Sequence, residues 1–232
     1  MLFKVDDEVF DLFPGLYLPV AVARGVDNRG EREEVTAFLK QTWQGLRESF
    51  DYPNAQSHPR ICLWREAFRH MGISGKRFRS SVEALVRRAL KDDHPFSINP
   101  LVDCYNAISL KHLVPAGAFD LGAITGDLTL RRTQEGERFQ EIGREPVPVA
   151  AGEVAYADAE TILTRHFVWR QAEKGKITSA TDYIFLVAEV LGEVGTEVAQ
   201  AVACDFGEVL VRFFGLQPQV FLVDQDRPQI EF

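Results

Sequence analysis

The chain has 232 residues, of which 46% are hydrophobic, and a formal net charge of −8 at pH 7. This length suits one large domain or two small ones, and no apolar run approaches the roughly 20 residues that a membrane-spanning helix needs. The acidic start MLFKVDDEVFDLF lacks the basic residues and the apolar block of a secretory signal. We therefore expect a cytoplasmic protein that does not engage membranes.

The first half of the chain predicts strands followed by helices. Residues 9–13 and 16–23 are rich in β-branched and aromatic residues and are separated by Pro14-Gly15, which favours two strands. Apolar residues at a spacing of three and four predict a helix over residues 31–50. A second helix is expected over residues 59–71, where Pro59 suits the first turn.

A capped helix opens the middle of the chain. Ser80 precedes it as the expected N-cap, and Glu83 stands three residues later, as in a capping box. Residues 101–113 keep a helical period, after which the period drops to two. Strands are then expected over residues 127–133, 137–142, 153–157 and 161–169.

The last third begins with a strongly apolar stretch over residues 181–192, which we interpret as a helix. In such a helix Asp182, Glu189 and Glu193 would share one face. A final helix is expected over residues 196–214, and a short strand follows over residues 220–223. Helices and strands come in separate runs and do not alternate, which predicts an α+β fold.

The three cysteines carry little functional signal. Cys62, Cys104 and Cys204 are far apart, odd in number and without a CxxC pair. This spacing argues against a disulfide framework and against a zinc site. We expect three buried, unreactive thiols, and no metal or other cofactor.

The charge is unevenly distributed. Between Arg60 and Lys91 there are nine basic residues and two acidic ones, which gives this segment a net charge of +7 in an acidic protein. A basic patch of this kind can attract phosphate groups locally. Part of it could equally pair with the acidic remainder of the chain. The residues that we predict to bind RNA are Lys76, Arg77, Arg79, Arg87 and Arg88.

An ordered series of motifs runs from Ser80 to Thr178. It consists of the serine before EAL, a double arginine, INPLVD-x-YN-x-ISLK, P-x-G-x-x-D, GDLTLRR and GEVAYAD. This series resembles the B3/4 domain, a module of the bacterial phenylalanyl-tRNA synthetase beta chain that also occurs as a free-standing protein. The resemblance covers roughly residues 60–192.

The resemblance implies three layers, with two packed β-sheets and a covering helical layer. No long linker separates residues 1–55 or 193–232 from the similar core, so residues 1–232 are expected to form a single domain. In the synthetase the module hydrolyses the ester that joins a wrong amino acid to the 3′ end of tRNA. Synthetases need such a step because binding alone rejects near-isosteres poorly.

The resemblance also points to site residues. The family's asparagine falls on Asn106, and a late acidic residue falls on Glu189, which would bind the substrate's ammonium group; both are assigned to the catalytic site. Tyr105 stands where the synthetase has threonine, and Gly117 stands where it has histidine. Arg170 and Thr178 complete the predicted substrate-binding set: Tyr105, Gly117, Arg170 and Thr178.

The leading hypothesis is a stand-alone, metal-independent deacylase of mischarged aminoacyl-tRNA. Its partner would be the aminoacylated 3′ end of tRNA, and we expect no binding to DNA. Two alternatives stay open. One is an RNA-binding module without catalysis, and the other is a sensor that binds a free amino acid and has lost tRNA binding. The two departures at Tyr105 and Gly117 leave the identity of the amino acid open.

Overall fold

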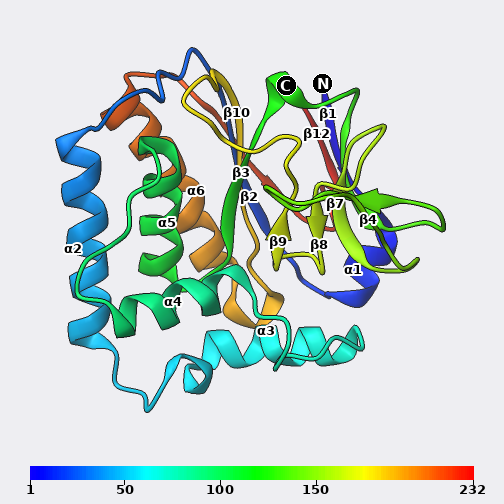
Figure 1. Cartoon of the computed structure of the whole chain (residues 1–232), viewed down its shortest axis with the longest axis horizontal. Helices are drawn as coiled ribbons and strands as arrows, with labels where there is room; N and C mark the ends of the chain where they lie inside the picture. The colour runs from blue at the N-terminus through cyan, green and yellow to red at the C-terminus, as the bar shows by residue number, and fades with distance from the viewer.

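The computed structural model describes residues 1–232 (Figure 1). Its helices are α1 (Asp7–Leu12), α2 (Glu33–Ser49), α3 (Pro59–His70), α4 (Ser81–Lys91), α5 (Pro100–His112) and α6 (Thr196–Phe214), with short 3-10 helices η1 (Ala55–Ser57), η2 (Leu121–Ala123) and η3 (Gly192–Val194). Its strands are β1 (Leu2–Val5), β2 (Leu18–Arg24), β3 (Ala116–Asp120), β4 (Leu128–Arg132), β5 (Arg138–Phe139), β6 (Val147–Pro148), β7 (Val154–Ala157), β8 (Thr164–Arg165), β9 (Arg170–Gln171), β10 (Tyr183–Ala188), β11 (Gln219–Val223) and β12 (Gln229–Glu231).

Eight of the strands form two four-stranded sheets. The outer sheet has the order β12-β1-β4-β7, and the central sheet has the order β11-β2-β10-β3. Pairing is antiparallel throughout, except that β1 and β4 run parallel. Two short hairpins, β5-β6 and β8-β9, stand beside the sheets. The predicted α+β class is confirmed.

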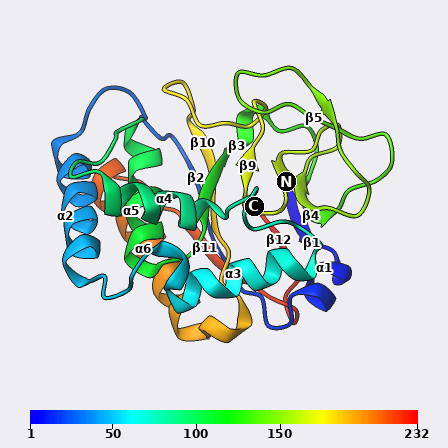
Figure 2. The same ribbon diagram turned by 60° about the horizontal axis from the view of Figure 1, so that its bottom comes forward.

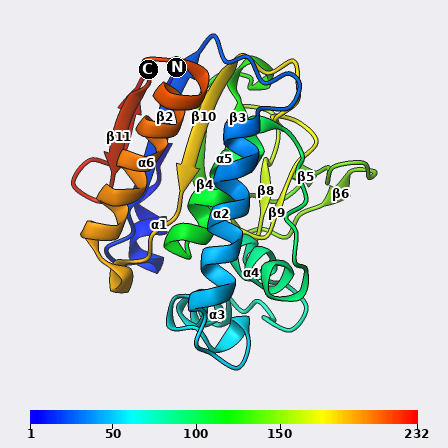
Figure 3. The ribbon, with the colours of Figure 1, turned by 90° about the vertical axis from the view of Figure 1, so that its left-hand side faces the viewer.

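Strand β10 shows how the layers are arranged, because both of its faces are buried. Phe185 and Val187 belong to a hydrophobic cluster that also contains residues of the outer sheet. Ile184 and Leu186, on the opposite face, belong to a second cluster shared with α5 and α6. The central sheet therefore lies between the outer sheet and a helical layer of α2, α5 and α6 (Figure 3).

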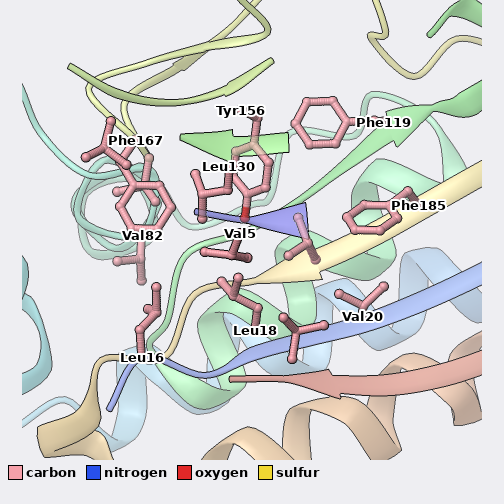
Figure 4. Packing of buried hydrophobic residues seen from close by; sticks show 14 of the residues in the cluster. Val5, Leu16, Leu18, Val20, Val82, Phe119, Leu130, Tyr156, Phe167 and Phe185 are labelled. Atoms are coloured by element: carbon pink, nitrogen blue, oxygen red, sulfur yellow. The ribbon is translucent and has the colours of Figure 1, made fainter. Parts of the chain in front are cut away.

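Aromatic side chains fill the space between the two sheets (Figure 4). The rings of Phe3 and Phe185 meet edge to face with centroids 4.9 Å apart, and those of Phe119 and Tyr156 lie 5.2 Å apart. Aromatic pairs of this geometry contribute about 0.5–1.5 kcal/mol each beyond the area that they bury. The two sheets are thus held together by large aromatic side chains.

The predicted helix over residues 181–192 is wrong. This stretch forms β10, followed by η3. All six residues of β10 are buried. When both faces of a segment are buried, its apolar residues show no periodicity, and a strand cannot be told from a helix by its pattern. The common face expected for the three acidic residues disappears with the helix, because Glu189 is buried whereas Asp182 and Glu193 are exposed.

The predicted strand over residues 9–13 is also wrong, since this segment lies mostly in α1. Asp7 and Glu8 occupy the first turn, where acidic residues favour a helix N-terminus. Val9 and Phe10 turn to the core. The neighbouring strand prediction is confirmed by β2, and the other predicted helices match α2, α3, α5 and α6 to within two residues at each end. Strands β3, β6, β9 and β12 were not predicted.

Helix α4 begins as the sequence indicates. The Ser80 side chain accepts a hydrogen bond from the Glu83 amide at 3.3 Å, which confirms Ser80 as the N-cap. The Glu83 carboxylate does not complete the capping box. It accepts hydrogen bonds of 2.9 Å and 2.5 Å from Arg65 on α3. Helix α3 runs along the bottom of the molecule in Figure 1 and comes to the front in Figure 2. The pair of Arg65 and Glu83 joins α3 to the first turn of α4.

Both ends of the chain contribute to the two sheets. Strand β1 pairs with β4 and β12, and β2 pairs with β10 and β11. Strands from outside residues 60–192 therefore hydrogen-bond directly to strands within that range. We infer from this interleaving that residues 1–232 form one domain. None of the helices combines the length and the apolar character required to cross a bilayer.

The expectation of three buried thiols holds only for Cys104. Cys62 is half-buried, and Cys204 is exposed on α6. Burial raises the pKa of the Cys104 thiol. The three cysteines are free.

Candidate functional site

A cavity of about 230 Å³ lies beside β3 and β7, each of which ends its sheet. The first residue of α4, one turn of α5 and the β8–β9 hairpin complete its wall. The inner surface is formed by side chains that are almost completely buried: Phe119, Tyr156, Phe167, Val187 and Glu189. The more exposed residues Ser81, Trp169 and Arg170 form the rim.

Helix α5 brings Tyr105 and Asn106 to the cavity. The helix is fixed at its start by Asn99, whose side chain accepts a hydrogen bond from the Val102 amide at 3.0 Å, and by Pro100 in the first turn. Neither the Tyr105 hydroxyl nor the Asn106 amide forms a hydrogen bond within the protein, although both side chains are half-buried. Their polar atoms are available to a ligand.

Gly117 lies on β3, opposite Val187 of β10. A Cβ atom at this position would meet no atom within 4 Å. The glycine thus leaves a bare stretch of cavity wall, at the place where the resemblance puts a histidine in the synthetase chain. The position has room for a side chain that this protein does not carry.

Glu189 follows β10 directly and is 5% exposed. The Tyr156 hydroxyl, which comes from β7 of the outer sheet, donates a hydrogen bond of 2.8 Å to its carboxyl group. Burial raises the pKa of Glu189 to about 8, and the hydrogen bond from Tyr156 opposes this shift only in part. Around neutral pH the cavity therefore holds a carboxyl group that is mainly protonated and that bridges the two sheets.

The β8–β9 hairpin supplies the rim. His166 and Phe167 have φ angles of 48° and 63°, a left-handed conformation that is uncommon for bulky residues. This tight turn places Phe167 inside the cavity and leaves Trp169 at its edge. The Ser81 amide of α4 donates a hydrogen bond of 2.8 Å to the Val168 carbonyl. The hairpin and α4 are thereby tied together across the cavity mouth.

Arg170 stands at the outer end of the cavity. Its side chain is 55% exposed and lies 3.4 Å from the Glu141 carboxylate. An exposed ion pair of this kind is weak, so the guanidinium group can exchange this partner for an anion at the rim.

Thr178 lies outside the cavity. Its amide donates to the Thr181 hydroxyl at 2.9 Å, and its carbonyl accepts from Asn28 at 2.8 Å. The structure therefore brings together Tyr105, Asn106, Gly117, Arg170 and Glu189, but not Thr178.

The basic residues predicted to bind RNA form two groups. Three lie in the loop before α4 and two lie near its C-terminal end: Lys76, Arg77, Arg79 and then Arg87, Arg88. Arg79 is 3.7 Å from the buried Glu83 carboxylate, and Arg77 lies over the ring of Phe78 at 5.1 Å. Phe78 in turn contacts Trp169 with ring centroids 4.6 Å apart. The loop is thus adjacent to the cavity rim.

Sequence reasoning missed several cavity residues. Tyr156 is the most informative, because its hydroxyl is the partner of Glu189. It stands in GEVAYAD, which we assigned to a strand, and a tyrosine in a strand that is buried throughout needs a hydrogen-bond partner inside the protein. Ser81 and Phe167 gave no comparable signal, since a helix start and a hairpin turn reach the cavity only through the tertiary fold.

Comparison with known proteins agrees with the motif series. The family model of the B3/4 domain matches residues 63–201, which is more than half of the chain. The phenylalanine–tRNA ligase beta subunit of Methylococcus capsulatus is 27% identical over 120 residues, covering 51% of this chain and 15% of that subunit. The chain thus matches only a small part of that curated relative.

Among solved structures, an N-terminal fragment of the phenylalanyl-tRNA synthetase beta subunit from Pyrococcus horikoshii is similar with a TM-score of 0.45 and 11% sequence identity. This alignment covers 96% of this chain and 54% of that chain. The family match and the ordered motifs between Ser80 and Thr178 place this chain in the B3/4 domain family.

Proposed function

We propose that the protein binds the aminoacylated 3′ end of tRNA and hydrolyses the ester of a mischarged amino acid. The observation that carries this proposal is the convergence of Asn106, Gly117 and Glu189 on one cavity, from α5, β3 and the end of β10. These residues are far apart in the chain, and nothing in local structure requires them to meet.

The reaction needs a positioned water molecule. The water oxygen would bond to the ester carbonyl carbon, the bond from that carbon to the ribose oxygen would break, and the water's proton would pass to the ribose oxygen. The Asn106 amide, which has no partner in the protein, can donate to the developing oxyanion or hold the water. An ester is labile, so positioning alone supplies a large share of the rate.

Glu189 would bind the substrate's ammonium group. Because its pKa is raised to about 8 by burial, the free protein carries it mainly as the neutral acid near pH 7. An ammonium group beside it would favour the carboxylate, as a charge-assisted hydrogen bond does. Binding would therefore release a proton. Affinity for an ammonium ligand should rise as the pH increases from about 6 to about 8.

The rim suits the nucleic-acid part of such a substrate. Trp169 offers a half-buried aromatic ring, and the exposed guanidinium group of Arg170 lies 5.5 Å from that ring. Lys76 and Arg77 are exposed in the adjoining loop. Stacking on aromatic rings and contacts from basic residues to phosphate are the usual means of holding single-stranded ends.

The decisive experiment is a panel of aminoacyl-tRNAs, each incubated with the protein and followed for loss of the ester. We expect faster loss for at least one mischarged pair than for its correctly charged counterpart. Loss of no ester, together with micromolar tRNA binding, would favour the RNA-binding module without catalysis. Binding of a free amino acid without any affinity for tRNA would favour the sensor.

A further inference from the structure

Helix α4 connects the cavity to a second hollow. Ser81, its first residue, lines the cavity, whereas Arg88 and Lys91 near its other end line a groove of about 510 Å³. With Ala84 these residues follow a spacing of three and four, so they lie along one face of the helix. At 1.5 Å per residue, Ser81 and Lys91 are about 15 Å apart along the axis.

This face of α4 is open to solvent. Ala84, Arg88 and Lys91 are exposed, and Ser81 is half-buried at the cavity rim. The opposite face carries the buried side chains of Val82 and Val86. A ligand lying on the exposed face would therefore reach from the groove to the cavity without displacing any part of the core.

The groove is lined by basic side chains that lack acidic partners. Arg87, Arg88 and Lys91 form no ion pair in the structure, whereas Arg65 on α3 is held by Glu83 and Arg47 on α2 by Asp93. Asp92 is the one acidic residue in the lining, so the groove keeps an excess of positive charge. In a protein with a net charge of −8 this excess stands out as a local anion site.

An exposed aromatic ring stands next to these charges. Phe96 is 60% exposed, and the guanidinium carbon of Arg88 lies 5.6 Å from its ring centroid. Tyr52, 41% exposed, precedes the groove residue Pro53. Basic groups and exposed rings in alternation are typical of surfaces that bind single-stranded nucleic acid, because phosphates contact the former and bases stack on the latter.

We propose that single-stranded RNA binds along the exposed face of α4, with its phosphates at Arg87, Arg88 and Lys91, a base on Phe96, and its 3′ end at the cavity mouth beside Ser81. The direction of the strand rests on the proposed function, while the binding surface does not. The strand would span the distance of about 15 Å along α4 between the groove and the cavity. Helix α4 would thus set how many unpaired nucleotides separate the groove from the cavity.

The test measures binding of a short fluorescent single-stranded RNA by anisotropy over a range of salt concentrations. The variant Arg87→Gln/Arg88→Gln/Lys91→Gln removes the three charges of the groove. The control Lys40→Gln/Arg212→Gln/Arg227→Gln removes the same charge from exposed residues of α2, α6 and the turn between β11 and β12.

We expect the groove variant to bind at least tenfold more weakly. The plot of log affinity against log salt should also become less steep, its negative slope shrinking in magnitude by about 2, because each phosphate contact on a single strand contributes about 0.7. The control should keep the wild-type slope. Phe96→Ala should weaken binding by about tenfold with the slope unchanged. An unchanged slope in the groove variant, equal losses in both triple variants, or absence of RNA binding by the wild-type protein would overturn the proposal.

A second pair of substrates separates this proposal from the proposed function. The groove variant should hydrolyse a mischarged aminoacyl-tRNA with a lower kcat/KM but cleave the corresponding aminoacyl-adenosine at the wild-type rate. If the wild-type protein cleaves neither substrate, the hydrolytic function fails, while the salt dependence of RNA binding still decides the role of the groove. Equal losses on both substrates would contradict the role of the groove.

Discussion

Two regions along α5 hold polar side chains in different ways. At its N-terminus, the Asn28 amide nitrogen donates to Asn99 at 3.0 Å and to the Thr178 carbonyl at 2.8 Å, and its oxygen accepts from the Leu101 amide at 2.9 Å. About two turns further along, the amide of Asn106 faces the cavity without a partner in the protein.

The difference separates a structural site from a candidate ligand site. Asn28 is 1% exposed and joins three segments, so removing it would leave buried groups unpaired. The side-chain amide of Asn106 has donor and acceptor groups that form no hydrogen bond within the protein. The same contrast holds for two buried carboxyl groups, because Glu83 is paired with Arg65 whereas Glu189 has only the Tyr156 hydroxyl.

The largest effect should come from Glu189. Its folded-state pKa of about 8 lies above the ordinary value of 4.5, so between these values the folded protein holds a proton that the unfolded chain releases. The free energy of unfolding should therefore fall as the pH rises from about 5 to about 8, by up to several kcal/mol. Glu189→Gln should remove this decline.

Urea denaturation at a series of pH values measures this effect as the difference between wild type and Glu189→Gln. Groups elsewhere titrate in both proteins and cancel in the difference. The two stability curves should converge near pH 5 and separate above it. Curves that stay parallel across the window would mean that Glu189 is not held as a neutral acid.

Asn28→Ala should have the next largest effect on the free energy of unfolding. It leaves the Leu101 amide without its partner in a buried position, which costs about 3 kcal/mol when the lost bonds to Asn99 and Thr178 are included. In a protein of this size the melting temperature should fall by roughly 6–12 °C. Asn106→Ala is the matched control, with a shift of at most about 2 °C. Similar losses in both variants would remove the distinction between the two regions.

Ser80→Ala should have a smaller effect, a loss of about 1 kcal/mol in the free energy of unfolding, because it removes the N-cap of α4. Ser80→Gly is a useful comparison, since replacing an N-cap serine by glycine lowers the free energy of unfolding by only about a few tenths of a kcal/mol. Chemical denaturation measures both. A wild-type stability in Ser80→Ala would show that Arg65 and Glu83 fix the start of α4 without the cap.

The sequence predicted most helices because their signals are local. Pro59, Ser80 and Pro100 stand in the first turn or at the cap of α3, α4 and α5. Residues 181–192 could not be assigned in this way, since β10 is apolar on both faces only because the outer sheet and the helical layer cover it. Similarly, α1 is too short for a clear helical period.

The candidate site was predictable only through the resemblance. Glu189 was placed in the site by its motif position, although the helix that we expected around it is absent. Thr178 was placed there by the same reasoning and lies elsewhere, because its hydrogen bonds connect it to Asn28 and Thr181. No local pattern indicates that Tyr156 and Glu189 meet, since they belong to different sheets.

The most direct test of the account is the single-turnover rate at which a mischarged aminoacyl-tRNA from the panel loses its ester, compared between wild type and Asn106→Ala. We predict a rate about 10–10³-fold lower in the variant, the size expected for one oxyanion or water-positioning donor. Its melting temperature and its affinity for uncharged tRNA should be unchanged. An equal rate in the two proteins would contradict the assignment of this cavity as the place where the ester is hydrolysed.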